Sequence, residues 1–311
     1  MIEIKKNISL ALYTTFRIGG PARFFVEAKN EEELIEALRY AKENNLEFFI
    51  LAGGSNVLIS DDGFNGLVVK LNNRKSTVDR NTIKADAGIS IAKLIKISTE
   101  NNLAGLEWAG GLPGTLGGAI RGNAGTFGFS MKDIVESVKV LDTENLKIKD
   151  YDLKSCEFEY RNSVFKKNSN LVILSAVLKF RSGDMNESQK KVKESIEWRK
   201  SVFPEIMSPG SFFKHTEPSE HNLKIIRKIP RFSELKLHEK NTIPTGFVIE
   251  ECGLKGKKMG GAMVSEKHAN FIVNTGGATA QDVIMLSSFI KQQVRDKFGV
   301  ELAEEVRLVG F

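Results

Sequence analysis

The segment 108–128 constrains this chain more than any other, and it reads WAGGLPGTLGGAIRGNAGTFG, with Arg121 as its only charged residue. Glycine costs conformational entropy inside a domain, so dense glycine persists where the backbone turns sharply or approaches a ligand closely. Such a backbone can direct its N–H groups at an anion, and a helix opening after Pro113 would aim its N-terminus at the same anion. A tight structural turn between packed strands is the alternative. The glycine density favours a phosphate-bearing ligand.

A second glycine cluster supports this interpretation. Residues 48–58 read FFILAGGSNVL, an apolar strand that opens onto Gly53, Gly54, Ser55 and Asn56. A buried strand that opens onto glycines and small polar side chains is a common anion cradle. Neither cluster contains G-x-x-x-x-G-K-[ST] or a G-x-G-x-x-G that opens a βαβ unit. The sequence therefore argues against both a P-loop and a standard Rossmann dinucleotide site.

The length and charge allow several classes of protein and exclude others. The chain has 311 residues, enough for two or three domains, and a net charge of +6. That charge suits nucleic acid or polyanionic small molecules. Because the lysines are scattered and no RNA-binding or zinc-finger motif occurs, we expect no nucleic-acid partner. No apolar run approaches the length of a membrane span and the start lacks a signal peptide, so we expect a cytoplasmic protein.

Histidines and cysteines give no sign of a metal centre. The histidines form no H-E-x-x-H pair, and the surroundings of the two cysteines lack metal-ligand spacing. We therefore expect no metal and inert thiols. These residues are His215, His221, His238, His268, Cys156 and Cys252.

Helix and strand signals alternate along the chain and predict an α/β or an α+β fold. Asn30 and Ser90 are candidate N-caps, and Thr279 with Asp282 resembles a capping box. Gly299 is a candidate C-cap of that last helix. Strands are expected at 48–51, 67–71, 135–141 and 171–180, and a charged connecting helix with a domain break is expected around 182–200. The polar, proline-interrupted segment 215–244 is an insertion, a lid or a plain surface loop.

Eight separated motifs together resemble one family, the UDP-N-acetylenolpyruvoylglucosamine reductases, also called UDP-N-acetylmuramate dehydrogenases. Any one of them is weak evidence, but they follow the order of the family over nearly the whole chain. They are TTFRIGGPA at 14–22, LAGGSNVL at 51–58, AGGLPGTLGGAIRGNAG at 109–125, YRNS at 160–163, GSFFK at 210–214, GGAMVSEKHANFIVN at 260–274, FGV at 298–300 and EV at 305–306.

The resemblance implies a two-subdomain FAD-binding portion of the vanillyl-alcohol-oxidase type and a C-terminal α/β substrate-binding domain. The expected parts are 1–70, to which 302–311 could return, 71–195, and 196–301. FAD would be held without a covalent link, because no histidine stands in the FAD portion. The residues expected to bind FAD are Ala52, Gly53, Gly54, Ser55, Asn56, Gly111, Pro113, Gly114, Thr115, Gly117 and Gly118.

The resemblance also implies a reaction in peptidoglycan precursor synthesis. NADPH would supply hydride through FAD to the enolpyruvyl group of UDP-N-acetylglucosamine enolpyruvate, giving UDP-N-acetylmuramate. Arg161 and Glu305 match residues that stabilise the enol-like intermediate, and Ser211 matches the proton donor. By sequence alone each could be a surface ion pair, a charged cluster or a turn. The residues expected to bind substrate are Tyr160, Arg161, Lys214, His215 and Glu251.

The chain departs from the family pattern at a few positions. His215 stands where the family usually has Asn or Arg, Ala303 stands where a second Glu is common, and the gap before 250–255 is long. Arg199 and Lys200 match loosely the basic residues that bind substrate phosphates, or they lie on a solvated helix face. Two other functions compete: a different flavin oxidase of the same fold, and a non-catalytic nucleotide-sugar binding protein.

Overall fold

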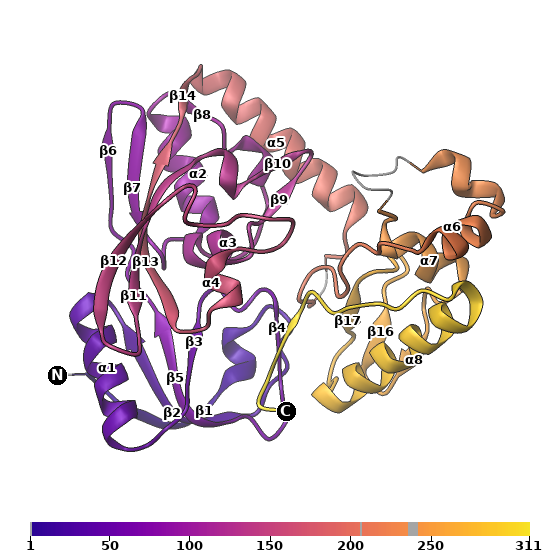
Figure 1. The fold of residues 1–311 in the computed structure, drawn as a ribbon, viewed down its shortest axis with the longest axis horizontal. Coiled ribbons are helices and arrows are strands. Elements are labelled where there is room, and N and C mark those ends of the chain that lie inside the picture. The colour runs from indigo at the N-terminus through magenta and orange to yellow at the C-terminus, as the bar shows by residue number, and fades with distance from the viewer. Residues whose placement is uncertain (1, 206, 236–241) are drawn as a thin grey trace. The chain divides into compact units, whose positions relative to one another are not determined.

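The structure, a computed structural model, describes residues 2–205, 207–235 and 242–311 and divides into two compact units (Figure 1). The first unit contains Met1–Ile8, Ala22–Gly54 and Asn65–Ser201. The second contains Ser9–Pro21, Ser55–Phe64 and Val202–Phe311. The three-part division expected from the sequence stays a prediction. His238 lies outside the described residues.

A four-stranded sheet with the order β1-β2-β5-β3 begins the first unit. Its strands are β1 (Lys5–Ser9), β2 (Pro21–Ala28), β5 (Phe64–Leu71) and β3 (Phe48–Leu51). Helix α1 (Glu31–Glu43) follows Asn30, whose side chain accepts a hydrogen bond from the Glu33 N–H at 2.8 Å. The predicted cap and both predicted strands in this region are therefore confirmed. The buried face of α1 is also the predicted one: Leu34, Ala37, Leu38 and Ala41.

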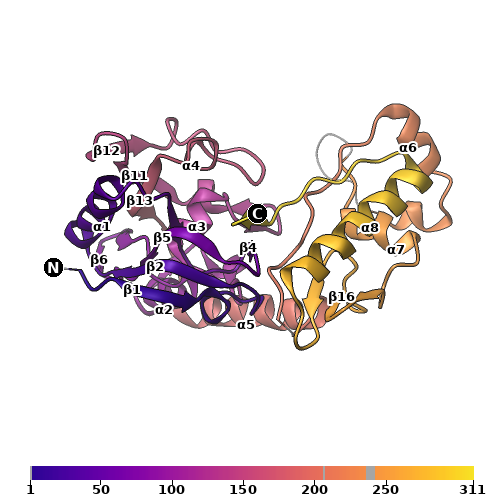
Figure 2. The same cartoon turned by 90° about the horizontal axis from the view of Figure 1, so that it is seen from below.

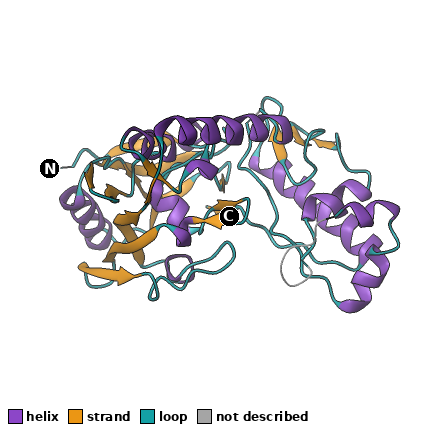
Figure 3. Ribbon diagram, turned by 90° about the horizontal axis from the view of Figure 1, so that it is seen from above, coloured by secondary structure: helices purple, strands orange, loops and turns teal. Residues whose placement is uncertain are grey.

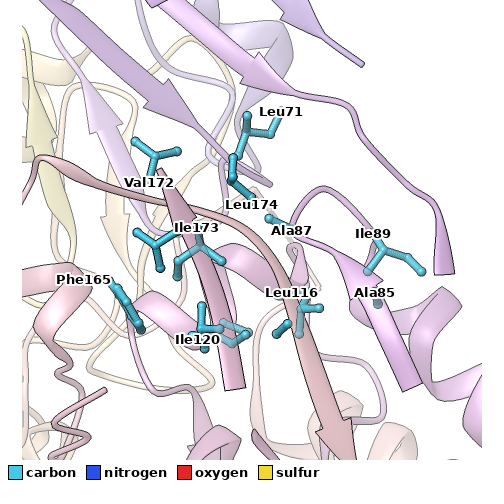
Figure 4. Close-up of a cluster of buried hydrophobic side chains, with 14 of the residues drawn as sticks. Leu71, Ala85, Ala87, Ile89, Leu116, Ile120, Phe165, Val172, Ile173 and Leu174 are labelled. Carbon is cyan, nitrogen blue, oxygen red and sulfur yellow. The ribbon is translucent and has the colours of Figure 1, made fainter. Parts of the chain in front are cut away.

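A five-stranded antiparallel sheet carries most of the core of the first unit. Its order is β12-β11-β13-β7-β6, with β12 (Lys147–Asp152), β11 (Val135–Asp142), β13 (Leu171–Lys179), β7 (Thr82–Asp86) and β6 (Ser76–Asp79). Figure 4 shows Leu116 and Ile120 of helix α3 (Leu116–Arg121) among side chains of this sheet, including Ile173. Because both α3 residues are fully buried, the core fixes the position of the glycine-rich segment that contains this helix.

The other elements of the first unit are mostly short. Helix α2 (Ile91–Glu100) begins after Ser90, which accepts from the Lys93 N–H at 3.2 Å, and the charged helix α5 (Met185–Val202) covers the predicted range; both are confirmed. The remaining elements are β8 (Leu103–Ala104), η2 (Glu107–Ala109), β9 (Gly125–Thr126), β10 (Phe129–Ser130), η3 (Met131–Asp133), α4 (Val164–Lys167) and β14 (Arg181–Ser182).

Helices dominate the second unit, as the colouring of Figure 3 shows. Helix α8 (Ala280–Phe298) packs against α6 (Glu220–Ile226) and α7 (Thr245–Glu251), which lie beside it in Figure 2. An antiparallel sheet β15-β16-β17 (Lys258–Met259, Ala262–Val264, Ile272–Asn274) completes the core. Strand β18 (Arg307–Val309) pairs in parallel with β4 (Val57–Ile59). The remaining elements are the 3-10 helices η1 (Leu10–Tyr13) and η4 (Pro230–Glu234).

The segment 215–244 is not a plain surface loop. It contains α6, and Leu223 and Ile226 of that helix are buried in the core of the second unit. Residues 236–241 of the segment lie outside the described part of the chain. Within that described part, no helix is both long and apolar enough to cross a lipid bilayer.

Both ends of α8 are capped as predicted. Thr279 and Asp282 form a reciprocal capping box, and the Asp61 carboxylate adds acceptors for the N–H groups of Ala280 and Gln281 at 2.8 and 3.1 Å. At the other end Gly299 adopts the left-handed conformation, with φ of +67°. An aspartate from a distant loop thus holds the N-terminus of this helix.

Replacing Gly299 with alanine should destabilise the second unit. The left-handed backbone disfavours a Cβ, so we expect Gly299→Ala to lower the free energy of unfolding by about 1–2 kcal/mol. Chemical denaturation of the flavin-free protein, followed by circular dichroism, measures this change. Gly299→Asn is the matched control, because asparagine tolerates this conformation, and it should lose less. Equal losses in the two variants would contradict the backbone explanation.

Candidate functional site

The two glycine-rich segments touch through their backbones in the first unit. A Cβ added to Gly53 would lie 2.5 Å from the Gly114 Cα and 3.2 Å from the Thr115 nitrogen. Gly54, Gly111 and Gly114 have φ values of +64°, +77° and +109°, which L side chains rarely adopt. Glycine is therefore required here both for the close approach and for the turns. This geometry agrees with the alternative of a tight turn between packed segments, and the binding of a phosphate-bearing ligand by these glycines stays a prediction.

The N–H groups of this region divide into two sets. The Leu116 and Gly117 N–H groups, in the first turn of α3, donate to the carbonyl groups of Ile89 and Ala87 at 2.9 Å each. Both are therefore occupied, and the expected use of this helix N-terminus as the anion site does not hold for them. Among the described residues, by contrast, the N–H groups of Gly53, Gly54 and Gly114 have no protein acceptor. The loops therefore offer donors to an anion, whereas the first two N–H groups of the helix do not.

The side chain of Thr115 gives a second indication of a ligand. Its Oγ1 is buried and has no hydrogen-bond partner within the described part of the chain. A buried hydroxyl without a partner costs about 1–3 kcal/mol, so such groups are uncommon in native proteins. A diphosphate would accept hydrogen bonds from this hydroxyl and from the glycine N–H groups. The residues present therefore fit the diphosphate of FAD.

Arg161 is held against the glycine-rich segment from a tight turn. Glu159 and Asn162 exchange backbone hydrogen bonds of 3.1 and 3.2 Å, which leaves Tyr160 and Arg161 at the tip, with Arg161 at a φ of +53°. The guanidinium donates to the Gly125 carbonyl at 2.8 Å and lies 5.4 Å from the centre of the Tyr160 ring. A residue held in this strained backbone conformation is typical of a functional position.

Arg199 approaches the same segment from α5. Its Nε donates to the Gly110 carbonyl at 2.8 Å, and Nη2 reaches the Trp108 carbonyl at 3.4 Å. Burial, and then the neighbouring charge of Arg161, lower the pKa of Arg199. The alternative of a solvated helix face is therefore wrong for Arg199, whereas Lys200 is exposed. Two guanidinium groups near each other create a region that favours an anion.

In the second unit, Ser211 lies on a segment that is paired on both sides. On one side the Phe212 N–H donates to the Asn270 carbonyl at 2.7 Å, and the Asn270 side chain bonds both backbone groups of Phe213, at 3.0 and 2.8 Å. On the other side the Glu305 N–H donates to the Phe212 carbonyl at 2.8 Å. These bonds bring the backbone around Ser211 next to the backbone at Glu305, although the two residues are far apart in sequence.

Asn270 holds the backbone next to Ser211, and the sequence alone did not single it out. It is 3% exposed. Its side-chain oxygen accepts a hydrogen bond from the Phe213 N–H, and its side-chain nitrogen donates one to the Phe213 carbonyl. The available signal was an asparagine between Ala269 and Phe271, inside an otherwise apolar run. Buried amides of this kind are retained where they hold a backbone in place.

Glu305 also contacts the end of the first glycine cluster. The Asn56 side chain donates to the Glu305 carbonyl at 3.3 Å, and the Asn56 carbonyl accepts from the Arg307 N–H at 3.1 Å. The neighbouring Glu304 instead forms an ion pair with Lys291 of α8. The adjacent acids Glu304 and Glu305 therefore have different surroundings. The backbone of Glu305 bonds Phe212, which follows Ser211, and the Asn56 side chain.

The predicted substrate-binding residues are placed differently from one another. Lys214 follows Ser211 closely, and its N–H donates to the Ala303 carbonyl at 2.9 Å. His215 is half-buried and Tyr160 is 55% exposed. Glu251 ends α7 and pairs with Arg231 at 3.3 Å. Lys214 therefore lies in the paired segment that contains Ser211, whereas, among the described residues, Glu251 shows no contact with that segment. The assignments of Lys214, His215, Tyr160 and Glu251 as substrate-binding residues stay predictions.

The thiols are poorly suited to chemistry. Burial raises the pKa of Cys156 to about 12 and that of Cys252 to about 11, so both stay protonated at neutral pH. This agrees with the prediction of inert thiols. Among the described residues, no group of three or more His, Cys, Asp or Glu side chains could hold a metal ion.

Comparison with known proteins defines the class and then the family. Residues 22–148 match the family model of an FAD binding domain, so the chain is an FAD-dependent oxidoreductase by class, as its glycine loops suggest. Residues 203–309 match the C-terminal domain of UDP-N-acetylenolpyruvoylglucosamine reductase. The chain belongs to the UDP-N-acetylenolpyruvoylglucosamine reductase family. The predicted fold class, an FAD-binding portion followed by a C-terminal domain, is confirmed, and so is FAD as the cofactor.

Individual relatives cover nearly the whole chain. The reductase of Caldanaerobacter subterraneus subsp. tengcongensis is 38% identical over 98% of this chain and 93% of its own length. That of Clostridium perfringens is 36% identical over 99% and 93%. The crystal structure of the Thermus caldophilus reductase covers 99% of this chain and 100% of its own, with 29% identity and a TM-score of 0.77.

Removing the Asn270 side chain should destabilise the site strongly. Asn270→Ala leaves the buried N–H and carbonyl of Phe213 unpaired, so we expect a loss of about 2–4 kcal/mol in the free energy of unfolding. Urea denaturation of the flavin-free protein measures it. Asn168→Ala, at an exposed position, is the control and should stay within about 0.5 kcal/mol of the parent. A similarly small effect at Asn270 would disprove its role in holding this segment.

Proposed function

We propose that this protein reduces the enolpyruvyl group of UDP-N-acetylglucosamine enolpyruvate to UDP-N-acetylmuramate, with NADPH as co-substrate, in the cytoplasmic synthesis of peptidoglycan precursors. Relatives that carry the reductase name cover nearly its whole length. The observation that carries the catalytic assignment is the pairing of the Ser211 segment with the Glu305 segment through Phe212. This backbone pairing brings the two segments together, which supports a site that contains the Ser211 hydroxyl and the Glu305 carboxylate.

The chemistry explains why these residue types are needed. FAD, when bound, supplies hydride transfer from NADPH to the methylene carbon of the enolpyruvyl group. Hydride addition there leaves negative charge on the neighbouring carbon, spread onto the substrate carboxylate. Donors fixed in advance stabilise such developing charge best, because they need no reorganisation during the reaction.

Arg161 is proposed to meet the developing charge. Its bond to the Gly125 carbonyl fixes one side of the guanidinium, and the Tyr160 ring lies beside it. A guanidinium has five N–H donors in a planar fork, so it can hold Gly125 and still bind a carboxylate. The fixed backbone of its turn supports this role, because the side chain starts from a defined point.

Ser211 is proposed to give the proton and Glu305 to assist it. A hydroxyl has little acidity in water, so it can donate only to a strongly basic, carbanion-like carbon within hydrogen-bond reach. The paired backbone around Phe212 and Asn270 supports this role by holding Ser211 in one place. Glu305 would stabilise the enol-like intermediate or relay the proton. Lys214, His215, Tyr160 and Glu251 are proposed substrate contacts.

One experiment separates this function from its competitors. The purified protein should be yellow, release free flavin on acid denaturation, and oxidise NADPH only when the enolpyruvyl sugar is present. A different flavin oxidase would consume another substrate, and a non-catalytic binding protein would consume none. NADPH oxidation that is independent of the sugar, or no oxidation at all, would refute the proposal.

Changing either charged catalytic residue should slow the second half-reaction and leave FAD bound. We expect Arg161→Lys and Glu305→Gln each to slow flavin reoxidation by the enolpyruvyl sugar about 100- to 1,000-fold, since a donor or charge fixed in advance is lost. Stopped-flow absorbance of the flavin measures this rate. Glu304→Gln is the matched control, because Glu304 pairs with Lys291, and it should reoxidise normally. Near-normal reoxidation in either test variant would remove that residue from the proposed catalytic set.

The Ser211 hydroxyl should matter for only one half-reaction. Ser211→Ala should allow NADPH to reduce the flavin but slow reoxidation about 100- to 10,000-fold, the range for a lost general acid. Ser211→Cys should recover part of the rate, because a thiol is the better acid. Ser208→Ala, three residues earlier, is the control. If Ser211→Ala slows both half-reactions equally, the serine is structural and the proton has another source.

A further inference from the structure

The two glycine-rich segments together contain a single cationic side chain. Residues 51–58 carry no charged side chain, and Arg121 is the only charge in 108–128. The diphosphate of FAD is an anion, so a cradle made of uncharged N–H groups gains from a positive charge placed behind it. The structure holds such a charge beside the first segment.

Lys70 lies next to that segment by the register of the sheet. Strands β3 and β5 pair in parallel, and Lys70 is opposite Leu51, the last residue of β3 before the glycines. Its ammonium donates to the Ala52 carbonyl at 2.8 Å. This is a charge-assisted hydrogen bond, and such bonds are roughly twice as strong as neutral ones.

The bond also sets the direction of the next N–H group. The described chain contains no cis peptide bond, so the Ala52–Gly53 peptide is trans. In a trans peptide the carbonyl and the N–H point in opposite directions. Because the Ala52 carbonyl points at Lys70, the Gly53 N–H points away from Lys70, and it has no protein acceptor among the described residues.

The groups around the Lys70 ammonium shift its pKa in both directions. Burial lowers the pKa of Lys70, and the positive charge of Arg74 lowers it further, whereas the carboxylate of Glu27 on β2 raises it. Glu27 also accepts a hydrogen bond from the Asn72 amide at 3.1 Å. Burial disfavours the charged form of this half-buried ammonium, and an anion bound nearby favours that form.

We propose that Lys70 is a positioning residue of the FAD diphosphate cradle. It fixes the Ala52–Gly53 peptide so that the Gly53 N–H is presented to the diphosphate, and its charge favours the anion through the same peptide. The inference rests on the FAD assignment that it shares with the proposed function. Its test needs neither NADPH nor the sugar substrate, so the two can fail separately.

The test is the affinity of the flavin-free protein for FAD, measured by quenching of flavin fluorescence. Lys70→Met keeps the length of the side chain but removes the charge and the donors, and should raise the Kd for FAD about 10- to 100-fold. Lys70→Arg keeps both and should recover most of the affinity. The control is Lys84→Met, at an exposed position of the neighbouring sheet, which should stay within about two-fold of the parent.

A pH profile distinguishes the charge from simple packing. The parent protein should lose affinity for FAD as the pH rises through the lowered pKa of Lys70, and Lys70→Met should lack that loss. If Lys70→Met does not fold by circular dichroism, Lys70→Gln replaces it with the same expected direction. An unchanged Kd in the variant, equal losses in the Met and Arg variants, or identical pH profiles would overturn the proposal.

Discussion

The contact between the backbones of Gly53 and Gly114 is the constraint on which the rest of the first unit depends. Any Cβ at Gly53 would collide with Gly114, so the two segments can meet only as glycine. Meeting there, they leave the N–H groups of Gly53, Gly54 and Gly114, among others, and the Thr115 hydroxyl without a partner among the described residues. The core beneath α3, built on Leu116 and Ile120, keeps that arrangement in place. A tightly packed core thus supports the loops that we propose as the diphosphate site.

In the second unit, hydrogen bonds rather than glycine packing hold the proposed catalytic segment in place. Here a buried amide, Asn270, and the backbone of residues 303–306 pair with both sides of the Ser211 segment. No charged side chain is needed to fix the position of the hydroxyl. Polar networks of this kind are stabilising only when every member is satisfied, and Asn270 satisfies both backbone groups of Phe213.

Local signals predicted the regular elements well. Asn30, Ser90, Thr279 and Gly299 act through residues within four positions of themselves, so their caps can be recognised in the sequence. The sequence could not show that the first two N–H groups of α3 donate to the carbonyl groups of Ile89 and Ala87, because those carbonyls lie far away along the chain. Nor could it separate Glu304, paired with Lys291, from Glu305, paired with the Ser211 segment. Two adjacent glutamates cannot be distinguished in the sequence, because their roles depend on the residues that they contact in the folded protein.

The sequence by itself determined the family, the cofactor class and the capped helices, because ordered motifs and short-range capping patterns are both written locally. Only the tertiary structure decided which N–H groups are available to an anion, that Arg199 lies against the glycine-rich segment, and that Asn270 and Lys70 hold backbone groups far away in sequence. The reason is physical. A hydrogen bond depends on distance and direction, and between residues far apart along the chain these are fixed by the packing of the core, not by the identity of neighbouring residues.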